Sequence, residues 1–240
     1  MERRGRGLRQ FRDRAEAGRA LAERLAREAW SEPVVLALPR GGVPVAVPVA
    51  VRLGVPVEAF VARKVGLPED PEVGIGAVAE GLDDMVVGEL AEQLGLDPRL
   101  LGDLAAREHE EVRRRVTAYR GARPLPDIAG RDVILVDDGL ATGVTTEAAV
   151  EALRACGPRR VVVAVPVCAP ESRTRLAGVA DAVVCLMAPY TLGAVGAWYQ
   201  DFAQVTDDEV LDLLAAVGPG RAGAPKPPAG RVTASGGEGP

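Results

Sequence analysis

The sequence predicts an α/β fold, a parallel sheet flanked by helices, because short apolar runs alternate with amphipathic segments along most of its 240 residues. Two of these runs, 133–136 and 161–167, are apolar throughout, as expected of strands that are covered on both faces. Crossover helices join parallel strands, so the alternation favours a parallel sheet. Ligands of such sheets bind beyond the carboxyl ends of the strands.

Local signals predict the individual elements. An apolar stripe predicts a helix over 11–30, and Pro44 suits the first turn of a second helix over 43–53. Asp97 as N-cap and Pro98 in the first turn predict a third, strongly charged helix. The third helix ends near Tyr119, and further helices are expected over 145–155, after Pro170 and from Thr206 to Val217. A loop is expected over 63–72. The expected strands are 34–38, 57–61, 74–79, 133–136, 161–167 and 182–186.

Composition excludes several classes of protein. With 48% hydrophobic residues the chain can build a core, so wholesale disorder is excluded. The net charge of −5 argues against a dedicated nucleic-acid binder, and we expect no direct nucleic-acid partner. Both ends are basic and the body between them is therefore acidic, so a phosphate ligand would need local donors or a metal ion. Three scattered cysteines and one histidine argue against a disulfide scaffold and against a zinc site.

One domain is expected over residues 11–218, between a basic, flexible N-terminus (1–10) and a disordered Gly/Pro/Ala-rich tail (219–240). Charge, Gly or Pro interrupts every apolar run, so we expect no membrane partner. The basic N-terminus lacks the apolar region of a secretory signal. The expected location is therefore the cytoplasm.

The most informative segment is 133–146, VILVDDGLATGVTT. Its apolar residues predict a strand that brings Asp137 and Asp138 to the carboxyl edge of the sheet. The small residues that follow lead into a helix, and the first amides of that helix, over 141–145, lack helical partners and can hold a phosphate. Acids beside such a cradle indicate a ligand that also presents hydroxyls or magnesium. A strand-end turn with helix capping is the alternative.

Two common nucleotide-binding motifs fit poorly. A Walker A loop needs a lysine after its last glycine, whereas Gly143 is followed by Val144 and Thr145. Residues 74–79, GIGAVA, formally match a dinucleotide-binding fingerprint. They follow a loop rich in proline and acids, however, and no helical pattern comes after them, so a nucleotide role is not expected there.

The segment 133–146 resembles the phosphoribosyl pyrophosphate (PRPP) signature of the type I phosphoribosyltransferases, with Gly139 where the family usually has an aliphatic residue. The resemblance implies the fold of that family, and it is closest to a bacterial branch whose acceptor we cannot name. It assigns Asp137 and Asp138 to the ribose hydroxyls and leaves a magnesium contact open to them. The residues that it assigns to the 5′-phosphate are Ala141, Thr142, Gly143, Val144 and Thr145.

The segment 38–42, LPRGG, resembles the pyrophosphate loop of the same family. Gly41 and Gly42 would let the backbone approach the diphosphate closely, and Arg40 would donate hydrogen bonds to it. In this family the loop often contains a cis peptide bond that does not involve a proline nitrogen. An ordinary Gly-Gly turn beside a surface arginine is the alternative.

Lys64 is unusual because only it and Lys226 are lysines among the 29 basic residues of the chain. A compact ammonium charge is not interchangeable with a guanidinium, which favours a functional role over chance. In the resemblance, Arg63 and Lys64 face the pyrophosphate at the border of a mobile catalytic loop, residues 65–80, that closes over the site. Together with Arg40 they are the candidate catalytic residues.

Aromatic side chains gather near the C-terminus, within expected hood elements at 187–202. In type I enzymes a small C-terminal hood subdomain often contacts the nucleobase. Tyr190, Trp198 and Tyr199 would stack on the base, and Asp201 would read its exocyclic groups. Simple packing of these aromatics against the last helix is an equally good interpretation.

The resemblance implies transfer of ribose 5-phosphate from PRPP to a nitrogen acceptor such as a nucleobase, with magnesium as cofactor and release of pyrophosphate. Hypoxanthine-guanine enzymes carry an acid where this chain has Ala141, so the acceptor stays open, as does a homodimer. A PRPP-binding regulator without catalysis is one alternative. A hydrolase or phosphorylase of a ribose 5-phosphate derivative is the other.

Overall fold

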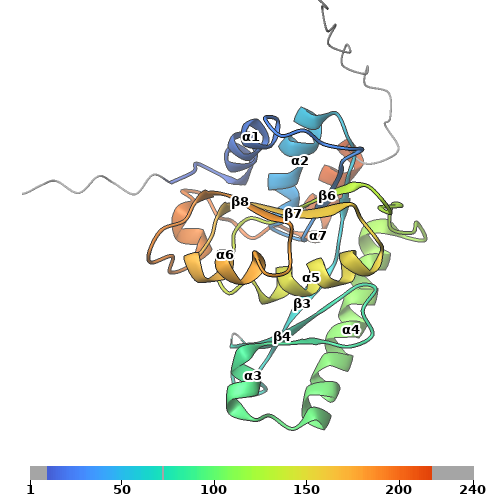
Figure 1. Ribbon diagram of the computed structural model, residues 1–240, viewed down its shortest axis with the longest axis vertical. Helices are drawn as coiled ribbons and strands as arrows, with labels where there is room; N and C mark the ends of the chain where they lie inside the picture. Colours follow the sequence, from blue (N-terminus) through green and yellow to red (C-terminus); the bar gives the residue numbers. More distant parts are fainter. Residues whose placement is uncertain (1–9, 72, 218–240) are drawn as a thin grey trace, which may run out of the picture.

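The computed structural model describes residues 10–71 and 73–217. Its centre is a parallel sheet of five strands in the order β2-β1-β6-β7-β8 (Figure 1). In-register pairing of β1 with β6, from Val34↔Val133 to Ala37↔Val136, brings two strand ends to the same edge. The strands are β1 (Val34–Ala37), β2 (Val57–Ala59), β6 (Asp132–Val136), β7 (Arg160–Val167) and β8 (Ala182–Met187). The expected parallel α/β fold is confirmed.

Helices cover both faces of this sheet, and each face has its own core. Because side chains alternate along a strand, Ile134 packs on one face and Leu135 on the other. The Ile134 face is covered by α1 (Arg14–Leu25), α2 (Gly42–Leu53) and α7 (Asp207–Val217), and the Leu135 face by α5 (Val144–Ala155) and α6 (Pro170–Leu176). This packing fixes the loops at the carboxyl edge.

A second, antiparallel sheet lies on the far side of α5 and forms a lower lobe together with α3 and α4 (Figure 1). Ala77 packs on the α5 side of this sheet, whereas Val78 packs on the α4 side with Val112. The lobe contains β3 (Ala62–Gly66), β4 (Gly74–Ala79), β5 (Val86–Val87), α3 (Glu89–Leu94) and α4 (Pro98–Arg120). The sequence analysis does not predict β5 or α3.

The expected loop over 63–72 is wrong in its first part, because β3 occupies 62–66 and pairs with β4. The charged residues Arg63 and Lys64 made this strand resemble a loop in the sequence. Val65 is the buried anchor of the strand, and the long side chains of Arg63 and Lys64 occupy half-buried positions on either face of it. The expected mobile loop 65–80 therefore contains most of a β-hairpin.

The expected helix over 11–30 is shorter at both ends. Asp13 caps α1 by accepting a hydrogen bond from the Glu16 amide, and the helix ends at Leu25, whose carbonyl accepts from the Trp30 indole. Phe11 instead forms an isolated bridge with Tyr199. The other predicted strands and helices are present to within about two residues, a normal scatter for element ends.

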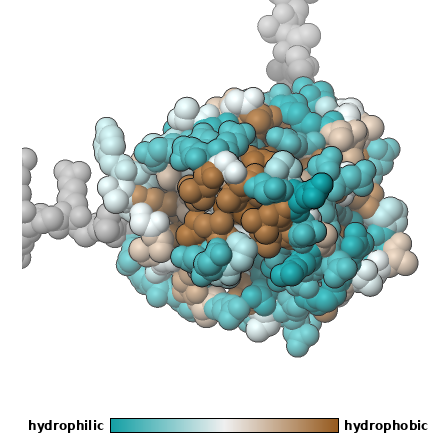
Figure 2. Space-filling view, turned by 90° about the horizontal axis from the view of Figure 1, so that it is seen from below, coloured by the Kyte–Doolittle hydropathy of each residue, from teal (hydrophilic) through white to brown (hydrophobic). Residues whose placement is uncertain are grey.

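Apolar side chains gather at the centre of the face seen from below the molecule (Figure 2). The most exposed large apolar residues of the lower lobe are Val87, Leu94 and Leu100.

No helix within residues 10–71 and 73–217 is long and apolar enough to cross a membrane. The predictions for residues 1–9 and 218–240 lie outside the described residues.

Candidate active site

The loops after β1 and β6 lie side by side, as their register requires. The Leu38 amide donates to the Val136 carbonyl (2.9 Å), which ties the two loops together. A Cβ on Gly41 would collide with Oδ2 of Asp138, and a Cβ on Gly42 would stand 2.6 Å from the Val136 carbonyl oxygen. Position 42 therefore requires glycine, and a side chain at position 41 would have to displace the Asp138 carboxylate, which argues against an ordinary surface turn. The Pro39–Arg40 peptide bond is cis, as the resemblance implies.

Asp137 and Asp138 stand at the carboxyl end of β6 but have different partners. Asp138 Oδ2 accepts a hydrogen bond from Arg14 Nε (2.8 Å). Asp137 Oδ1 accepts from the Asp138 amide (2.8 Å). Burial raises the pKa of both carboxyls, and the charge of Asp138 raises the pKa of Asp137 further. A cationic or hydroxyl-bearing ligand would stabilise the ionised pair.

The expected phosphate cradle stands at the start of α5. Gly143 has a φ of +77°, a conformation that glycine adopts without strain, and the Glu147 amide donates to its carbonyl (2.9 Å). The preceding amides thus have no helical partner. Ala141 and Thr142 are exposed, and the Ser172 hydroxyl donates to the Ala141 carbonyl. The loop borders a cleft of about 880 Å³, also lined by Gly74 and Glu89 of the lower lobe and by Arg175 of α6.

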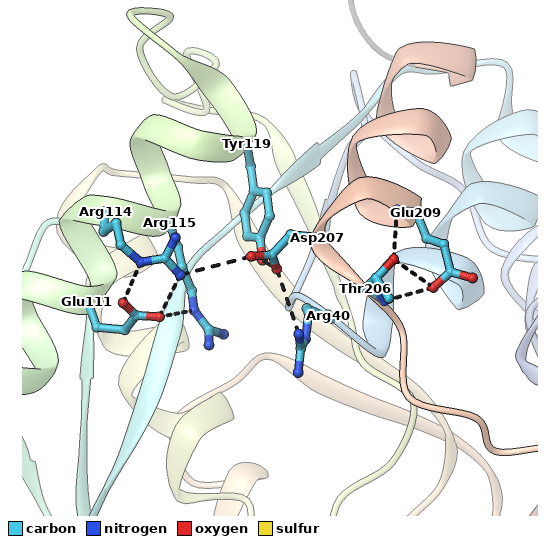
Figure 3. Close-up of polar contacts among 8 residues, drawn as sticks. All are labelled: Arg40, Glu111, Arg114, Arg115, Tyr119, Thr206, Asp207 and Glu209. Atoms are coloured by element: carbon cyan, nitrogen blue, oxygen red, sulfur yellow. Dashed lines mark hydrogen bonds and ion pairs between the residues drawn. The ribbon is translucent and has the colours of Figure 1, made fainter.

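Arg40 lies beside Asp207, the first residue of α7 (Figure 3). One guanidinium nitrogen of Arg40 lies 3.9 Å from Asp207 Oδ1, which accepts a hydrogen bond from the Tyr119 hydroxyl (2.6 Å). Arg114 lies 3.9 Å from the other Asp207 oxygen. Burial, followed by the bond to Asp207, raises the pKa of Tyr119 to about 12. The 38–42 loop is thereby linked to the lower lobe through α4.

Arg63 and Lys64 do not share one face of the small sheet. Arg63 Nε donates to Glu108 Oε2 of α4 (2.5 Å). Lys64 pairs with Ala77, whose side chain packs on the α5 side, and its stem lies against Gly74 at the cleft. Lys64 is therefore on the side of the phosphate cradle, and Arg63 is on the side of α4.

The C-terminal aromatics are mostly buried among themselves. The Tyr199 ring lies 5.8 Å from Phe11 and 5.0 Å from Phe202, and its hydroxyl donates to the Asp138 carbonyl (2.6 Å). The buried Trp198 donates to the Leu192 carbonyl. These contacts favour the packing interpretation for both residues.

Two expected base contacts lie at the surface. The Tyr190 side chain is fully exposed. Asp201 is also exposed, and its carboxylate accepts a hydrogen bond from the Ala203 amide. Trp198 and Tyr199 are buried whereas Tyr190 and Asp201 are exposed, so the four predicted residues do not share one exposed surface.

Comparison with known proteins identifies the family. The phosphoribosyl transferase domain matches residues 8–187, three quarters of the chain. The chain belongs to the phosphoribosyl transferase domain family. It is 41% identical over 204 residues to a Mycobacterium tuberculosis (strain ATCC 25618 / H37Rv) protein provisionally named phosphoribosyl transferase Rv0571c, covering 85% of this chain. The match covers 46% of that relative, so the chain spans about half the length of the curated relatives it matches.

A solved relative supports the fold over nearly its whole length. The crystal structure of TT1426 from Thermus thermophilus shares 48% sequence identity with this chain at a TM-score of 0.73. The match covers 87% of this chain and 99% of the relative. This similarity and the domain match confirm the expected phosphoribosyltransferase fold.

Sequence reasoning missed Arg14, Tyr119 and Asp207. Arg14 meets a partner 124 residues away in the chain, Asp138, and Tyr119 and Asp207 meet each other across 88 residues. No local pattern distinguishes Arg14 from the other arginines of an arginine-rich helix. Only the tertiary structure shows which of these charges meets the site.

Proposed function

We propose that this chain transfers ribose 5-phosphate from PRPP to a nitrogen acceptor and releases pyrophosphate. The observation that carries the proposal is the adjacency of the two loops: the cradle after β6 and the Gly41–Gly42 turn after β1 flank one pair of acids. A ligand with a phosphate at one end, hydroxyls in the middle and a diphosphate at the other matches this order of groups.

Each part of the donor has a proposed partner. The 5′-phosphate binds the free amides at the start of α5 and the hydroxyls of Thr142 and Thr145. The acid pair accepts hydrogen bonds from the ribose hydroxyls. Gly41 and Gly42 let the diphosphate approach the backbone, and Arg40 turns from Asp207 to meet it. Transfer then needs no covalent enzyme nucleophile.

Magnesium is the proposed cofactor. Among residues 10–71 and 73–217, no group of three or more acids, cysteines or histidines forms a ready-made metal site. One carboxylate fits the ion, because Asp137 has a hard oxygen donor and no ion-pair partner among the described side chains. The remaining ligands would come from PRPP itself. Bound there, magnesium would neutralise charge on the diphosphate.

Lys64 and Arg63 have separate proposed roles. Lys64 lies on the cleft side of β3 and takes up charge that develops on the leaving diphosphate. Arg63 is bound to Glu108 and must leave that carboxylate if it is to reach the ligand. Because its side chain lies on the same side of the small sheet as the proposed phosphate cradle, Lys64 ranks first among the candidate catalytic residues.

The acceptor remains a nucleobase-like nitrogen compound, and the proposed location is the cytoplasm. Ala141 offers no acid-base group in the cradle, so the acceptor must lose its proton to another group or to water. A PRPP-binding regulator is the second candidate. It is favoured by the carboxylate partners of Arg40 and Arg63, which occupy both arginines in this structure.

Phosphorus NMR of PRPP and magnesium with the protein, with and without pooled nucleobases, tests the proposal. Base-dependent appearance of pyrophosphate is the expected result, and division of the pool then identifies the acceptor. Broadened PRPP lines without turnover would support the regulator, and base-independent pyrophosphate release would support a hydrolase. An unchanged PRPP spectrum would contradict the whole assignment.

A further inference from the structure

The Arg14 side chain makes three contacts, which connect the first helix of the domain to the acid pair and to the segment before the last helix. Its Nε donates to Asp138 Oδ2 (2.8 Å), and one terminal nitrogen donates to the Ala203 carbonyl (2.8 Å). Its guanidinium carbon lies 3.7 Å from the centre of the Phe202 ring. Only 11% of the side chain is exposed. A guanidinium held in three ways is positioned far more strictly than an exposed surface charge.

Asp138 has two further contacts besides the ion pair with Arg14. Its carbonyl accepts from the Tyr199 hydroxyl (2.6 Å), and its Oδ2 lies where a Cβ of Gly41 would stand. The carboxylate oxygen that meets Arg14 is thus the one packed beneath the pyrophosphate loop. Asp138 therefore links α1, the 199–203 segment and the Gly41 turn.

Asp137 differs from its neighbour in this respect. Its carboxylate has no ion pair among the described residues, and its hydrogen bond uses only Oδ1, which accepts from the Asp138 amide. Two adjacent acids thus have different surroundings, one neutralised by a buried cation and one not. Each acid nevertheless keeps one carboxylate oxygen without a hydrogen bond among the described residues, Oδ2 of Asp137 and Oδ1 of Asp138, that can accept from a ligand hydroxyl.

We propose that Arg14 is a positioning residue of the PRPP site. By holding Asp138 Oδ2 under the 38–42 loop, it fixes the Gly41–Gly42 turn in the shape that receives a diphosphate, and it leaves one oxygen of each acid for the ribose hydroxyls. This inference rests on the proposed function. Arg14 acts through Asp138 and makes no contact with PRPP itself.

The test is the affinity of four variants for PRPP in the presence of magnesium, measured by isothermal titration calorimetry on the full chain. The variants are Arg14→Met, Arg14→Lys, Asp138→Asn and the double variant Arg14→Met/Asp138→Asn. Arg24→Met is the matched control, because Arg24 lies on the same helix in an exposed ion pair with Glu28. Thermal melts confirm that each variant is folded at the titration temperature.

Arg14→Met is expected to weaken PRPP binding by about tenfold or more, the effect of losing a hydrogen bond between charged groups. Lysine restores the charge but not the second bond, so Arg14→Lys should recover part of the loss. The double variant should bind within about threefold of Asp138→Asn, because the two residues act as one unit. Arg24→Met should bind like the wild type.

Three results separate the possibilities. If wild-type protein does not bind PRPP, the proposed function fails and the role of Arg14 falls with it. If wild type binds and folded Arg14→Met binds equally well, the proposed function stands and this inference is overturned. Additive losses in the double variant, without partial recovery by lysine, would reduce Arg14 to a merely structural residue and also overturn it.

Discussion

The parallel sheet and the small antiparallel sheet support the candidate site in different ways. Every residue of β6 is buried, and the acid pair and the proposed phosphate cradle follow directly from its end. β3 has three half-buried positions among its five residues, and β5 is two residues long and partly exposed. The first sheet is clamped between helices, whereas the second reaches into a lobe with exposed apolar side chains.

This difference predicts a division of labour. Ligand affinity requires backbone groups that are fixed before the ligand arrives, so it belongs to the loops of the buried sheet. Residues that approach the ligand only during turnover are better carried by a less constrained element, so they belong to the small sheet. Affinity and turnover should therefore respond to different mutations.

The largest effect is expected at the buried sheet. The double variant Asp137→Asn/Asp138→Asn removes both charged acceptors of the ribose hydroxyls and should lower PRPP affinity by at least about 100-fold. Calorimetric titration with PRPP and magnesium measures it. Asp127→Asn, an exposed acid away from the site, is the control. Unchanged affinity in the double variant would refute the site.

The next effect belongs to the small sheet. Lys64→Ala should lower turnover by about 100-fold, because it removes charge stabilisation from the leaving diphosphate, while PRPP affinity changes little. Pyrophosphate release and calorimetry give the two values separately. Lys64→Arg should recover only part of the rate. Equal losses of affinity and turnover would contradict the claim that the small sheet serves turnover and not affinity.

The sequence predicts the buried sheet well because its signals are local. Uniformly apolar runs identify β6 and β7, and the candidate ligand-binding residues over 137–145 are consecutive in the sequence. The sequence also singles out the two glycines of the 38–42 loop, and the structure shows what a side chain at each would meet. These features need no knowledge of distant contacts.

The small sheet and the aromatic cluster could not be predicted in the same way. β3 pairs polar residues with a glycine-rich partner strand, so its apolar pattern is weak. Tyr199 and Trp198 fit a base-stacking role equally well until their contacts with Phe11 and the Leu192 carbonyl are seen. Arg14 depends entirely on a contact formed by tertiary folding.

A smaller effect, on stability rather than on binding, is expected at the end of β6 that lies away from the site. Asp132 is fully buried, and its Oδ2 accepts from the Ser31 amide (2.8 Å) and from Arg159 (2.6 Å). Asp132→Ala should lower the free energy of unfolding by about 2 kcal/mol, because buried donors lose a charged acceptor. Urea denaturation measures the loss. A change in PRPP affinity without this destabilisation would contradict the separation of scaffold from site.

The smallest effect is a pH dependence in the lower lobe. Hydrogen bonding from Arg114, together with Arg115, lowers the pKa of Glu111 from 4.5 to about 2. A lowered folded-state pKa stabilises the protein above pH 4.5, and this stabilisation is lost as the pH falls toward 2. Glu111→Gln should make the melting temperature fall less steeply as the pH is lowered. The corresponding loss of unfolding free energy is at most about 1 kcal/mol, because the ion pair is partly exposed.

The control for this measurement is Glu110→Gln, at an exposed position of the same helix. It should leave the fall of melting temperature at low pH as steep as in the wild type. Equal flattening in both variants would show that the overall charge of α4, rather than the Glu111 pair, governs acid stability.

Calorimetric titration of the wild-type protein with PRPP, with and without magnesium, tests the central claim most directly. The loops after β1 and β6 are predicted to form one site, so saturable binding of one PRPP per chain is expected, strengthened by magnesium. Binding of ribose 5-phosphate or pyrophosphate alone should be weaker, because each fills only one of the two loops. Absence of PRPP binding under both conditions would contradict the account.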